Sequence, residues 1–189
     1  EPWVDKESAR SYTKTVDIPF PLREPRSIEH VQTKELEPMA LREIVLYDDP
    51  VLRKKSRPVA EVNDKIRQLL DDMAETMYHS EIGAGLAAPQ VGILKRLVVI
   101  DMGDGLIKLV NPEIVDAEGE QEVIEGCLSF PNRWGKLKRP YRVKVSALNE
   151  KGEPVTFDVT GEKAKCFCHE VDHLDGVLFV DKVTEFVEL

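Results

Sequence analysis

Apolar side chains recur with a helical period in the first half of the chain. Between residues 63 and 79, the segment NDKIRQLLDDMAETMYH carries them three and four positions apart. They are Ile66, Leu69, Leu70, Met73 and Met77. This spacing places them on one face of a helix, and Asn63 is a suitable N-terminal cap. The pattern predicts an amphipathic helix over residues 63–79, with its methionines filling the core.

Short β-branched segments, separated by glycine, proline and asparagine, follow this helix and are typical of strands. They read RLVVIDM, IKLVNPEIV, EVIEG, YRVKVSALNE and PVTFDVT, and LNEKGEP predicts a hairpin loop between the last two. A second helix is predicted from about Glu162. We also expect an early strand after Met39 and a final strand at VLFV, residues 177–180. This order indicates an α+β fold, with mixed or antiparallel sheets packed around the second helix.

The character of the chain changes at Met39. Residues 1–38 are rich in charge, contain five of the twelve prolines and show no sustained period, so we expect an extension there. The extension contains eight acidic residues, whereas organellar transit peptides are poor in acids. Residues 39–189 are predicted to form a single domain.

Composition and charge argue against several classes of function. A net charge of −9 disfavours nucleic-acid binding through a basic face, and the basic stretch RWGKLKRPYR is interpreted as a solvated strand edge or turn. No apolar run is long enough to span a bilayer, and no secretory signal opens the chain. The three cysteines are an odd number, and two stand beside a histidine. They favour metal or thiol chemistry in a reducing cytoplasm over a disulfide framework.

Candidate chemistry is concentrated in CFCHEVDHLDG, residues 166–176. His169 and His173 are four residues apart, so a helix places both on one face, where they can bind one metal ion. Glu170 stands at the edge of that face and can reach a water on the ion. The alternative is that both histidines are surface or core residues that match the motif by chance.

A catalytic metal site needs a third protein ligand and one position left open. Cys127, in EGCLSF at the end of a predicted strand, is the favoured third ligand. Cys168 points about 100° away from His169 around the helix and is expected to pack against the sheet. Cys166 is interpreted as a pocket-wall residue.

Three segments together resemble peptide deformylase: GAGLAAPQ at 83–90, EGCLS at 125–129 and HEVDH at 169–173. The pattern of that family is G-x-G-h-A-A-x-Q, E-G-C-h-S and H-E-x-D-H, where h is an apolar residue. The resemblance runs from Met39 to about Val183. It implies a compact, bacterial-type hydrolase that removes the formyl group from the N-terminal methionine of newly made polypeptides and releases formate.

The resemblance also implies the roles of the site residues. The implied metal ligands are Cys127, His169 and His173. They would hold one divalent metal, iron(II) in the cell, with zinc, nickel or cobalt as substitutes in a purified sample. A metal-bound water or hydroxide would attack the formyl carbon, with Glu170 as general base and then acid. Gln90 and the backbone N–H of Leu128 would stabilise the oxyanion.

A substrate pocket and its supports are implied in the same way. The pocket residues are Gly83, Ala84, Gly85, Val123, Glu125 and Cys166. Arg139 is expected to pair with Glu125 and brace the cysteine strand, and Asp172 is expected to support the metal-binding helix. The implied partners are N-formylmethionyl nascent peptides. We expect a monomer that contacts neither nucleic acid nor membrane and that comes near the ribosome only transiently. We expect no ribosome docking through a basic C-terminal helix, because TEFVEL is acidic.

Two other classes of function compete with this interpretation. A metallopeptidase or another amidase could use the same water, although Cys127 together with Gln90 favours formyl chemistry. A metal-stabilised binding module without activity is the second alternative. Replacement of Glu170 or Gln90 would be expected in such a module, and both residues are present.

Overall fold

The computed structural model describes residues 40–80 and 83–188. The extension expected at residues 1–38 lies outside the described residues. Within the described part of the chain, no helix has the length and apolar character needed to cross a membrane.

The first long helix, α1, spans Asp64–His79 and confirms the helix predicted from the apolar period. The Asn63 side chain accepts a hydrogen bond from the Ile66 N–H at 3.2 Å, so it caps the helix as expected. The buried face of α1 packs against β1 and β2. The methionines Met73 and Met77 are fully buried in this contact.

The larger sheet has five antiparallel strands in the order β1-β2-β3-β6-β7. The strands are β1 (Gly85–Ala87), β2 (Leu97–Ile100), β3 (Ile107–Glu118), β6 (Arg142–Leu148) and β7 (Pro154–Thr160). The turn between β6 and β7 is closed by a hydrogen bond from the Asn149 N–H to the Glu153 carbonyl, which confirms the predicted hairpin.

The smaller sheet has three antiparallel strands in the order β4-β5-β8. They are β4 (Gln121–Cys127), β5 (Phe130–Arg139) and β8 (Glu185–Val187). The basic stretch beginning at Arg133 is therefore largely strand β5. Since β4 pairs only with β5 in the described part of the chain, its other edge is open.

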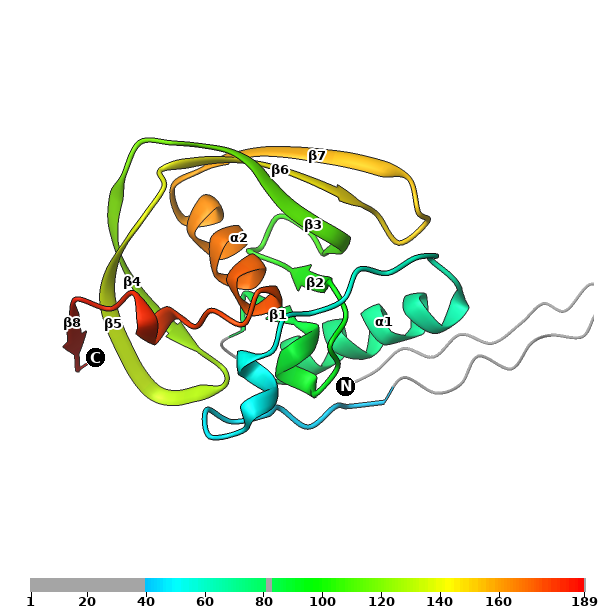
Figure 1. The fold of residues 1–189 in the computed structure, drawn as a ribbon, viewed down its shortest axis with the longest axis horizontal. Coiled ribbons are helices and arrows are strands. Elements are labelled where there is room, and N and C mark those ends of the chain that lie inside the picture. Colours follow the sequence, from blue (N-terminus) through cyan, green and yellow to red (C-terminus); the bar gives the residue numbers. More distant parts are fainter. Residues whose placement is uncertain (1–39, 81–82, 189) are drawn as a thin grey trace, which may run out of the picture. The chain divides into compact units, whose positions relative to one another are not determined.

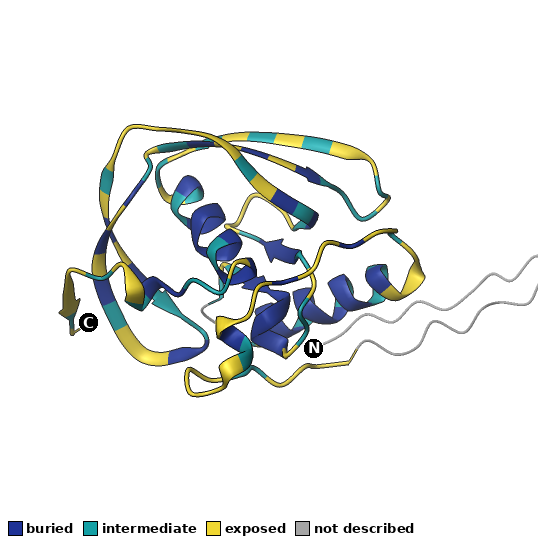
Figure 2. Ribbon diagram, in the orientation of Figure 1, coloured by how far each residue is buried: buried dark blue, intermediate teal, exposed yellow. Residues whose placement is uncertain are grey.

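The second long helix, α2 (Gly161–Leu174), contacts strands of both sheets, and Figure 1 shows it between them. Figure 2 shows this helix mainly dark blue with some teal, so most of its residues are buried. Two antiparallel sheets around a central helix confirm the α+β fold expected from the sequence. Three short 3₁₀ turns complete the described residues: η1 (Pro50–Arg53), η2 (Ala88–Val91) and η3 (Phe179–Asp181).

Two of the predicted strands are wrong. In place of an early strand, backbone N–H groups of Ala40 and Arg42 donate to the side chains of Asp72 and Thr76 on α1, at 3.1 and 2.9 Å. These side chains satisfy the donors that a neighbouring strand would otherwise have accepted. At VLFV, Leu178 and Phe179 are buried and the chain turns into η3, where Asp181 accepts from the Leu178 N–H at 2.9 Å.

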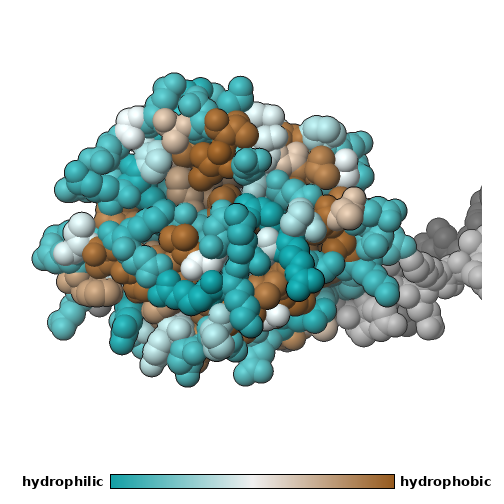
Figure 3. All heavy atoms as spheres, viewed as in Figure 1, coloured by the Kyte–Doolittle hydropathy of each residue, from teal (hydrophilic) through white to brown (hydrophobic). Residues whose placement is uncertain are grey.

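On the face drawn in Figure 3, apolar atoms form separate groups between hydrophilic ones. Among the exposed large apolar residues, the exposed fractions of Phe186 on β8 and of Tyr47 are 59% and 52%. Single exposed apolar residues are normal on protein surfaces. Buried apolar side chains form clusters between α1 and the large sheet, between α2 and that sheet, and beneath β4 and β5.

Candidate metal centre

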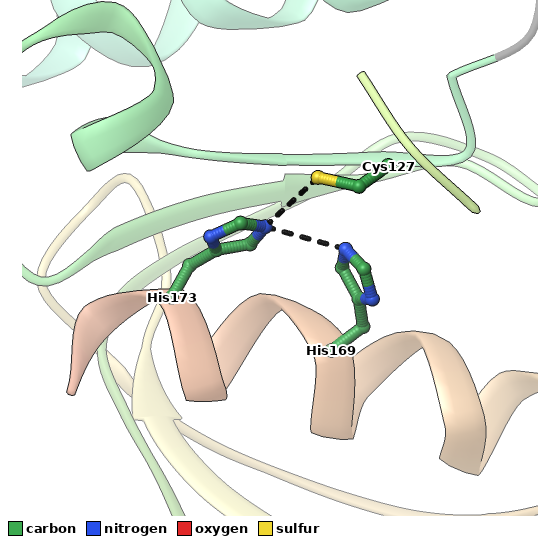
Figure 4. A group of neighbouring side chains, drawn as sticks. All are labelled: Cys127, His169 and His173. Atoms are coloured by element: carbon green, nitrogen blue, oxygen red, sulfur yellow. Dashed lines mark hydrogen bonds between the residues drawn. The ribbon is translucent and has the colours of Figure 1, made fainter. Parts of the chain in front are cut away.

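Three donor side chains converge from two elements that are far apart in the sequence (Figure 4). His169 and His173 project from one face of α2, and Cys127 stands at the last position of β4. The Cys127 Sγ atom lies 3.4 Å from Nε2 of His173, and the two histidine Nε2 atoms lie 3.2 Å apart. Cys127 is half-buried and both histidines are buried.

These separations fit one metal ion. With metal–nitrogen bonds of about 2.0–2.1 Å and a metal–sulfur bond of about 2.3 Å, tetrahedral ligand atoms lie roughly 3.3–3.6 Å apart. The ligand atoms of all three residues lie within 4.8 Å of one another. A thiolate and two imidazoles are donors suited to zinc, iron, nickel or cobalt. The Cys-His-His metal site expected from the motifs is therefore present.

The first of these histidines is held by a buried carboxylate. Nδ1 of His169 lies 2.8 Å from Oε2 of Glu125, which leaves its Nε2 for the metal. Both oxygens of Glu125 also accept from the Arg139 guanidinium, at 2.7 and 2.9 Å. The Arg139 guanidinium also donates to Oδ2 of Asp172 at 2.5 Å, and Lys182 donates to the same oxygen.

The ionisation of these groups follows from this arrangement. Burial alone would raise the pKa of Glu125, but hydrogen bonds from Arg139 and His169 outweigh it and lower the pKa to about 2. Burial also lowers the pKa of His173, so this imidazole is neutral, as a metal ligand must be. For His169, burial is outweighed by Cys127 and Glu125, and the pKa lies above its usual value. Metal binding must therefore displace a proton there.

Glu170 is a buried carboxylate directly beside the metal ligands. Burial raises its pKa from 4.5 to about 7. Its Oε2 atom has no hydrogen-bond partner in the described residues, and the side chain crosses close to Gly85 on β1. A Cβ atom at Gly85 would lie 2.5 Å from Oε1 of Glu170, so only glycine leaves room for this carboxylate.

Gln90 reaches the same site from η2, and its amide orientation is fixed by its neighbours. Its Oε1 atom accepts from the Ala87 N–H at 2.9 Å. The amide nitrogen therefore faces the site, 3.4 Å from Sγ of Cys127 and 3.3 Å from the Ser129 hydroxyl. Gln90 is 1% exposed, so this orientation is held inside the protein.

A cleft of about 380 Å³ opens beside these groups. It is lined by Gln90, Leu128 and Glu170, by the metal ligands Cys127 and His169, and by Gly83, Ala84, Gly85, Glu125 and Cys166 of the predicted pocket. Cys166 is buried there, and burial raises the pKa of its thiol, so it forms an apolar wall.

Sequence comparison identifies the family of this chain. The sequence model of the family described as "Polypeptide deformylase" matches residues 41–188. The chain belongs to the polypeptide deformylase family. It is 65% identical over 150 residues to peptide deformylase 2 of Clostridium acetobutylicum, covering 79% of this chain and 100% of that relative. It is 57% identical over 150 residues to the peptide deformylase of Acetivibrio thermocellus, covering 79% and 88% of the two chains.

Solved deformylase structures share the fold. The crystal structure of the Thermotoga maritima peptide deformylase matches with a TM-score of 0.75 and 42% identity, covering 77% of this chain and 99% of that one. The Synechococcus elongatus peptide deformylase, crystallised with actinonin, matches with a TM-score of 0.74 and 42% identity, covering 76% and 79%. The chain is thus an enzyme with peptide deformylase activity, and the family expected from the three motifs is confirmed.

Not every residue expected in the deformylase pocket lies there. Val123 packs in the apolar cluster with Leu137 and Phe179, because it faces inward on β4 two residues before Glu125. Its neighbour Ile124 lines the cleft instead. Cys168 is 3% exposed in the cluster between α2 and the large sheet, away from the metal ligands.

Some site residues were not predicted from the sequence. Ser129 lies within the EGCLS motif, but the contact of its hydroxyl with Gln90 depends on the folding of two distant segments. Met102 and the residues from Phe130 to Trp134 also line the cleft. Met102 belongs to none of the three motifs. Of the residues from Phe130 to Trp134, only Arg133 and Trp134 fall in the stretch interpreted as a basic strand edge or turn.

Proposed function

We propose that this deformylase hydrolyses the formamide of N-formylmethionyl peptides, with Glu170 as the general base and then the general acid. The observation that carries this proposal is the Glu170 carboxylate itself. It is 4% exposed, adjacent in sequence to His169, and has one oxygen without a partner among the described residues. Its pKa of about 7 allows it to accept and return a proton near neutral pH.

We propose that Cys127, His169 and His173 hold the metal, which when bound activates the attacking water and polarises the formyl carbonyl. The donor set suits several divalent metals. We propose iron(II) for the cell, by resemblance to the family, with zinc, nickel or cobalt able to replace it.

Glu170 would carry one proton from the attacking water to the departing amine nitrogen. Its Oε2 atom accepts the proton that the attacking water loses as the bond to the formyl carbon forms. When the C–N bond breaks, the same oxygen returns the proton to the departing amine nitrogen. The products are formate and a free N-terminus, and atoms and charge balance without a further reactant. The raised pKa supports this double role, because a carboxylate with an ordinary pKa would be a weaker base.

Two donors would stabilise the oxyanion that forms on the formyl oxygen. The amide nitrogen of Gln90 faces the site because Ala87 fixes the opposite side of that amide. Leu128, the residue after Cys127, lines the same cleft, and its backbone N–H would be the second donor. Donors held in place before the reaction lower the barrier without reorganisation.

The substrate would bind as an extended strand at the end of the large sheet. In the described residues β1 is an edge strand, and Gly83, Ala84 and Gly85 line the cleft beside it. A peptide can pair with such an edge, and glycine permits a close approach. Cys166 forms the apolar wall against which the methionine side chain would lie.

All site residues fall between Gly83 and His173, within one compact unit. We therefore propose that residues 39–189 act as one domain and that a monomer is sufficient for activity. Nascent formylated peptides would be met in the compartment where they are synthesised, which is the cytoplasm of a bacterium.

The test is formate release from formyl-Met-Ala-Ser by protein purified without oxygen and shown to carry one metal per chain. Glu170→Gln should retain the metal and lose activity by about 10²–10⁴-fold. Glu113→Gln, which makes the same exchange at an exposed position on β3, should remain fully active.

The two alternatives predict different outcomes. Equal hydrolysis of acetyl-Met-Ala-Ser would identify a general amidase in place of a deformylase. Metal-loaded protein that releases no formate would indicate a binding module. An active Glu170→Gln variant would remove Glu170 from the mechanism while leaving the activity itself intact.

A further inference from the structure

The start of β5 carries a bulge beside the metal site. Gly126 of β4 pairs with Trp134, but the next residue, Cys127, pairs with Phe130. Three residues of β5 are therefore inserted between neighbouring pairs, namely Pro131, Asn132 and Arg133. All three are exposed, and Asn132 has φ 60°, a left-handed conformation that is uncommon for a residue other than glycine. Bulges and such conformations are frequent at functional sites.

This bulge forms part of the rim of the catalytic cleft. Its three residues line the cleft together with Trp134, whose ring lies across Gly126. A second hollow, lined by Phe186 and Val187 of β8, is bordered by Asn132, Arg133 and Trp134 as well. The bulge therefore borders two hollows, and a side chain upon it can face bound substrate.

Arg133 is held on this rim without a carboxylate partner among residues 40–80 and 83–188. Its guanidinium carbon lies 5.4 Å from the ring centre of Tyr47, and that ring lies 5.6 Å from the ring of the buried Phe130. Contacts of this kind orient a cation without neutralising it. In the part of the chain that the structure describes, Arg133 forms no ion pair.

Two other charged groups around the cleft have partners of opposite charge: Lys165 pairs with Glu162 on α2, and Glu125 pairs with Arg139. Glu170 also lines the cleft, but it lies beside the metal ligands. Acidic residues outnumber basic ones in the sequence by 35 to 26, so a guanidinium left without a carboxylate at this rim is conspicuous. An oriented cation with its charge unpaired is suited to bind a carboxylate of the ligand.

We propose that Arg133 binds a carboxylate side chain of the substrate, downstream of the formylmethionine. The enzyme would then favour formylated chains with an aspartate or glutamate at the position that crosses the β5 bulge. This inference rests on the proposed function, because it assumes that the peptide lies in the cleft with its formyl group at the metal. Tyr47 is a positioning residue for the guanidinium.

The test uses the full chain and formyl-Met-tetrapeptide amides that carry Glu, Gln or Lys at the second, third or fourth position. At one position, the Glu peptide should show a kcat/KM about two- to fivefold above the Lys peptide at low salt, the range expected for an exposed ion pair. The difference should lie mainly in KM. It should shrink in about 0.5 M salt, because salt at this concentration strongly screens surface charges.

Variants locate the effect. Arg133→Gln should abolish the Glu preference and Arg133→Lys should retain part of it. Tyr47→Leu should weaken the preference while cleavage of formyl-Met-Ala-Ala-Ala amide, the all-alanine peptide, persists. Lys144→Gln, an exposed cation on β6 of the other sheet, should leave the preference unchanged.

The outcomes separate this inference from the proposed function. No preference at any position, or a preference that survives in Arg133→Gln, would overturn the role of Arg133 while the all-alanine peptide is still cleaved. Failure of the native enzyme to cleave the all-alanine peptide would overturn the proposed function, and this inference with it.

Discussion

Nδ1 of His169 lies 2.8 Å from Oε2 of Glu125, and both residues are buried. Through this contact, the metal ligand on α2 is joined to β4, and through Arg139 it is joined to β5. Arg139 then returns to α2 at Asp172, three residues after His169. The two elements that supply the metal ligands are thus fixed to each other by one buried set of charges.

Replacement of Glu125 by Gln should weaken both folding and metal binding. The change leaves Arg139, which is 3% exposed, without its main counter-charge. Removing one partner of a buried pair costs about 3–5 kcal/mol in the free energy of unfolding. Loss of the group that orients a metal-binding histidine reduces metal affinity by about 10–100-fold. Urea unfolding and competition with a chelator measure the two effects.

Glu122→Gln is the matched control, because Glu122 is exposed on the same strand β4. It should leave the urea midpoint and the metal affinity unchanged. Equal effects of the two substitutions would mean that the loss reflects negative charge on the strand in general, and the contact with His169 would have no special role.

The Glu125 carboxylate should make the stability of the metal-free protein depend on pH. Its pKa is about 2 in the folded protein, below the ordinary value of 4.5. A lowered pKa contributes stability that is fully present above pH about 4.5 and is lost as the pH falls toward 2. The contribution is about 3 kcal/mol. Urea unfolding of chelator-treated protein, measured from about pH 6 down to about pH 3, gives the free energy of unfolding across this titration. As the pH falls, this free energy should decline less for Glu125→Gln than for the native chain.

The elements that could be predicted are those in which apolar and polar residues follow a regular period along the sequence, or in which turn residues separate two such segments. The apolar period of α1 and the hairpin of β6 and β7 depend on neighbouring residues, so their prediction needed no tertiary information. The helical spacing of His169 and His173 is local in the same sense. Two of the quoted motifs supplied the metal ligands, because Cys127 stands at a fixed place in EGCLS and both histidines stand at fixed places in HEVDH.

The features that were missed depend on contacts between distant residues. The segment after Met39 reads as a strand, but Asp72 and Thr76 of α1 accept its N–H groups. VLFV has strong strand propensity, yet burial of Phe179 turns the chain into η3. The pairing of Arg133 with the ring of Tyr47 joins residues far apart in the sequence, and no periodicity could have indicated it.

Gly85→Ala should reduce catalysis while the protein still binds metal. The added Cβ would lie 2.5 Å from Oε1 and 2.8 Å from Cδ of Glu170. The carboxylate must then move. A displacement of about 1 Å can cost about 10²-fold in rate. Steady-state formate release should show this loss in kcat, and metal analysis should still find one ion per chain.

The control for this substitution is Gly152→Ala in the turn between β6 and β7. Gly152 has φ 82°, so alanine is strained there by about 1 kcal/mol, but the residue lies away from the cleft. This variant should lose stability and keep its kcat. If Gly85→Ala keeps its kcat as well, the close approach of Glu170 to β1 has no part in catalysis.

Two substitutions at Gln90 separate its structural contact from its catalytic one. Gln90→Glu retains an oxygen that can accept from the Ala87 N–H, but it removes the amide donor that faces Cys127 and Ser129. It should lower kcat by about 10²–10³-fold with a small change in KM, as for other lost oxyanion donors. Gln90→Leu removes both contacts and leaves the buried Ala87 N–H unpaired, so it should also lose about 1–3 kcal/mol of stability.

The comparison of these two variants decides what Gln90 does. If the amide donor acts on the oxyanion, both variants lose kcat to a similar extent and differ in their unfolding midpoints. If Gln90 serves only to hold η2 against β1, Gln90→Glu keeps both its kcat and its stability, because the contact with Ala87 survives. Formate release and urea unfolding on the same metal-loaded samples distinguish the two cases, since each explanation moves a different pair of measurements.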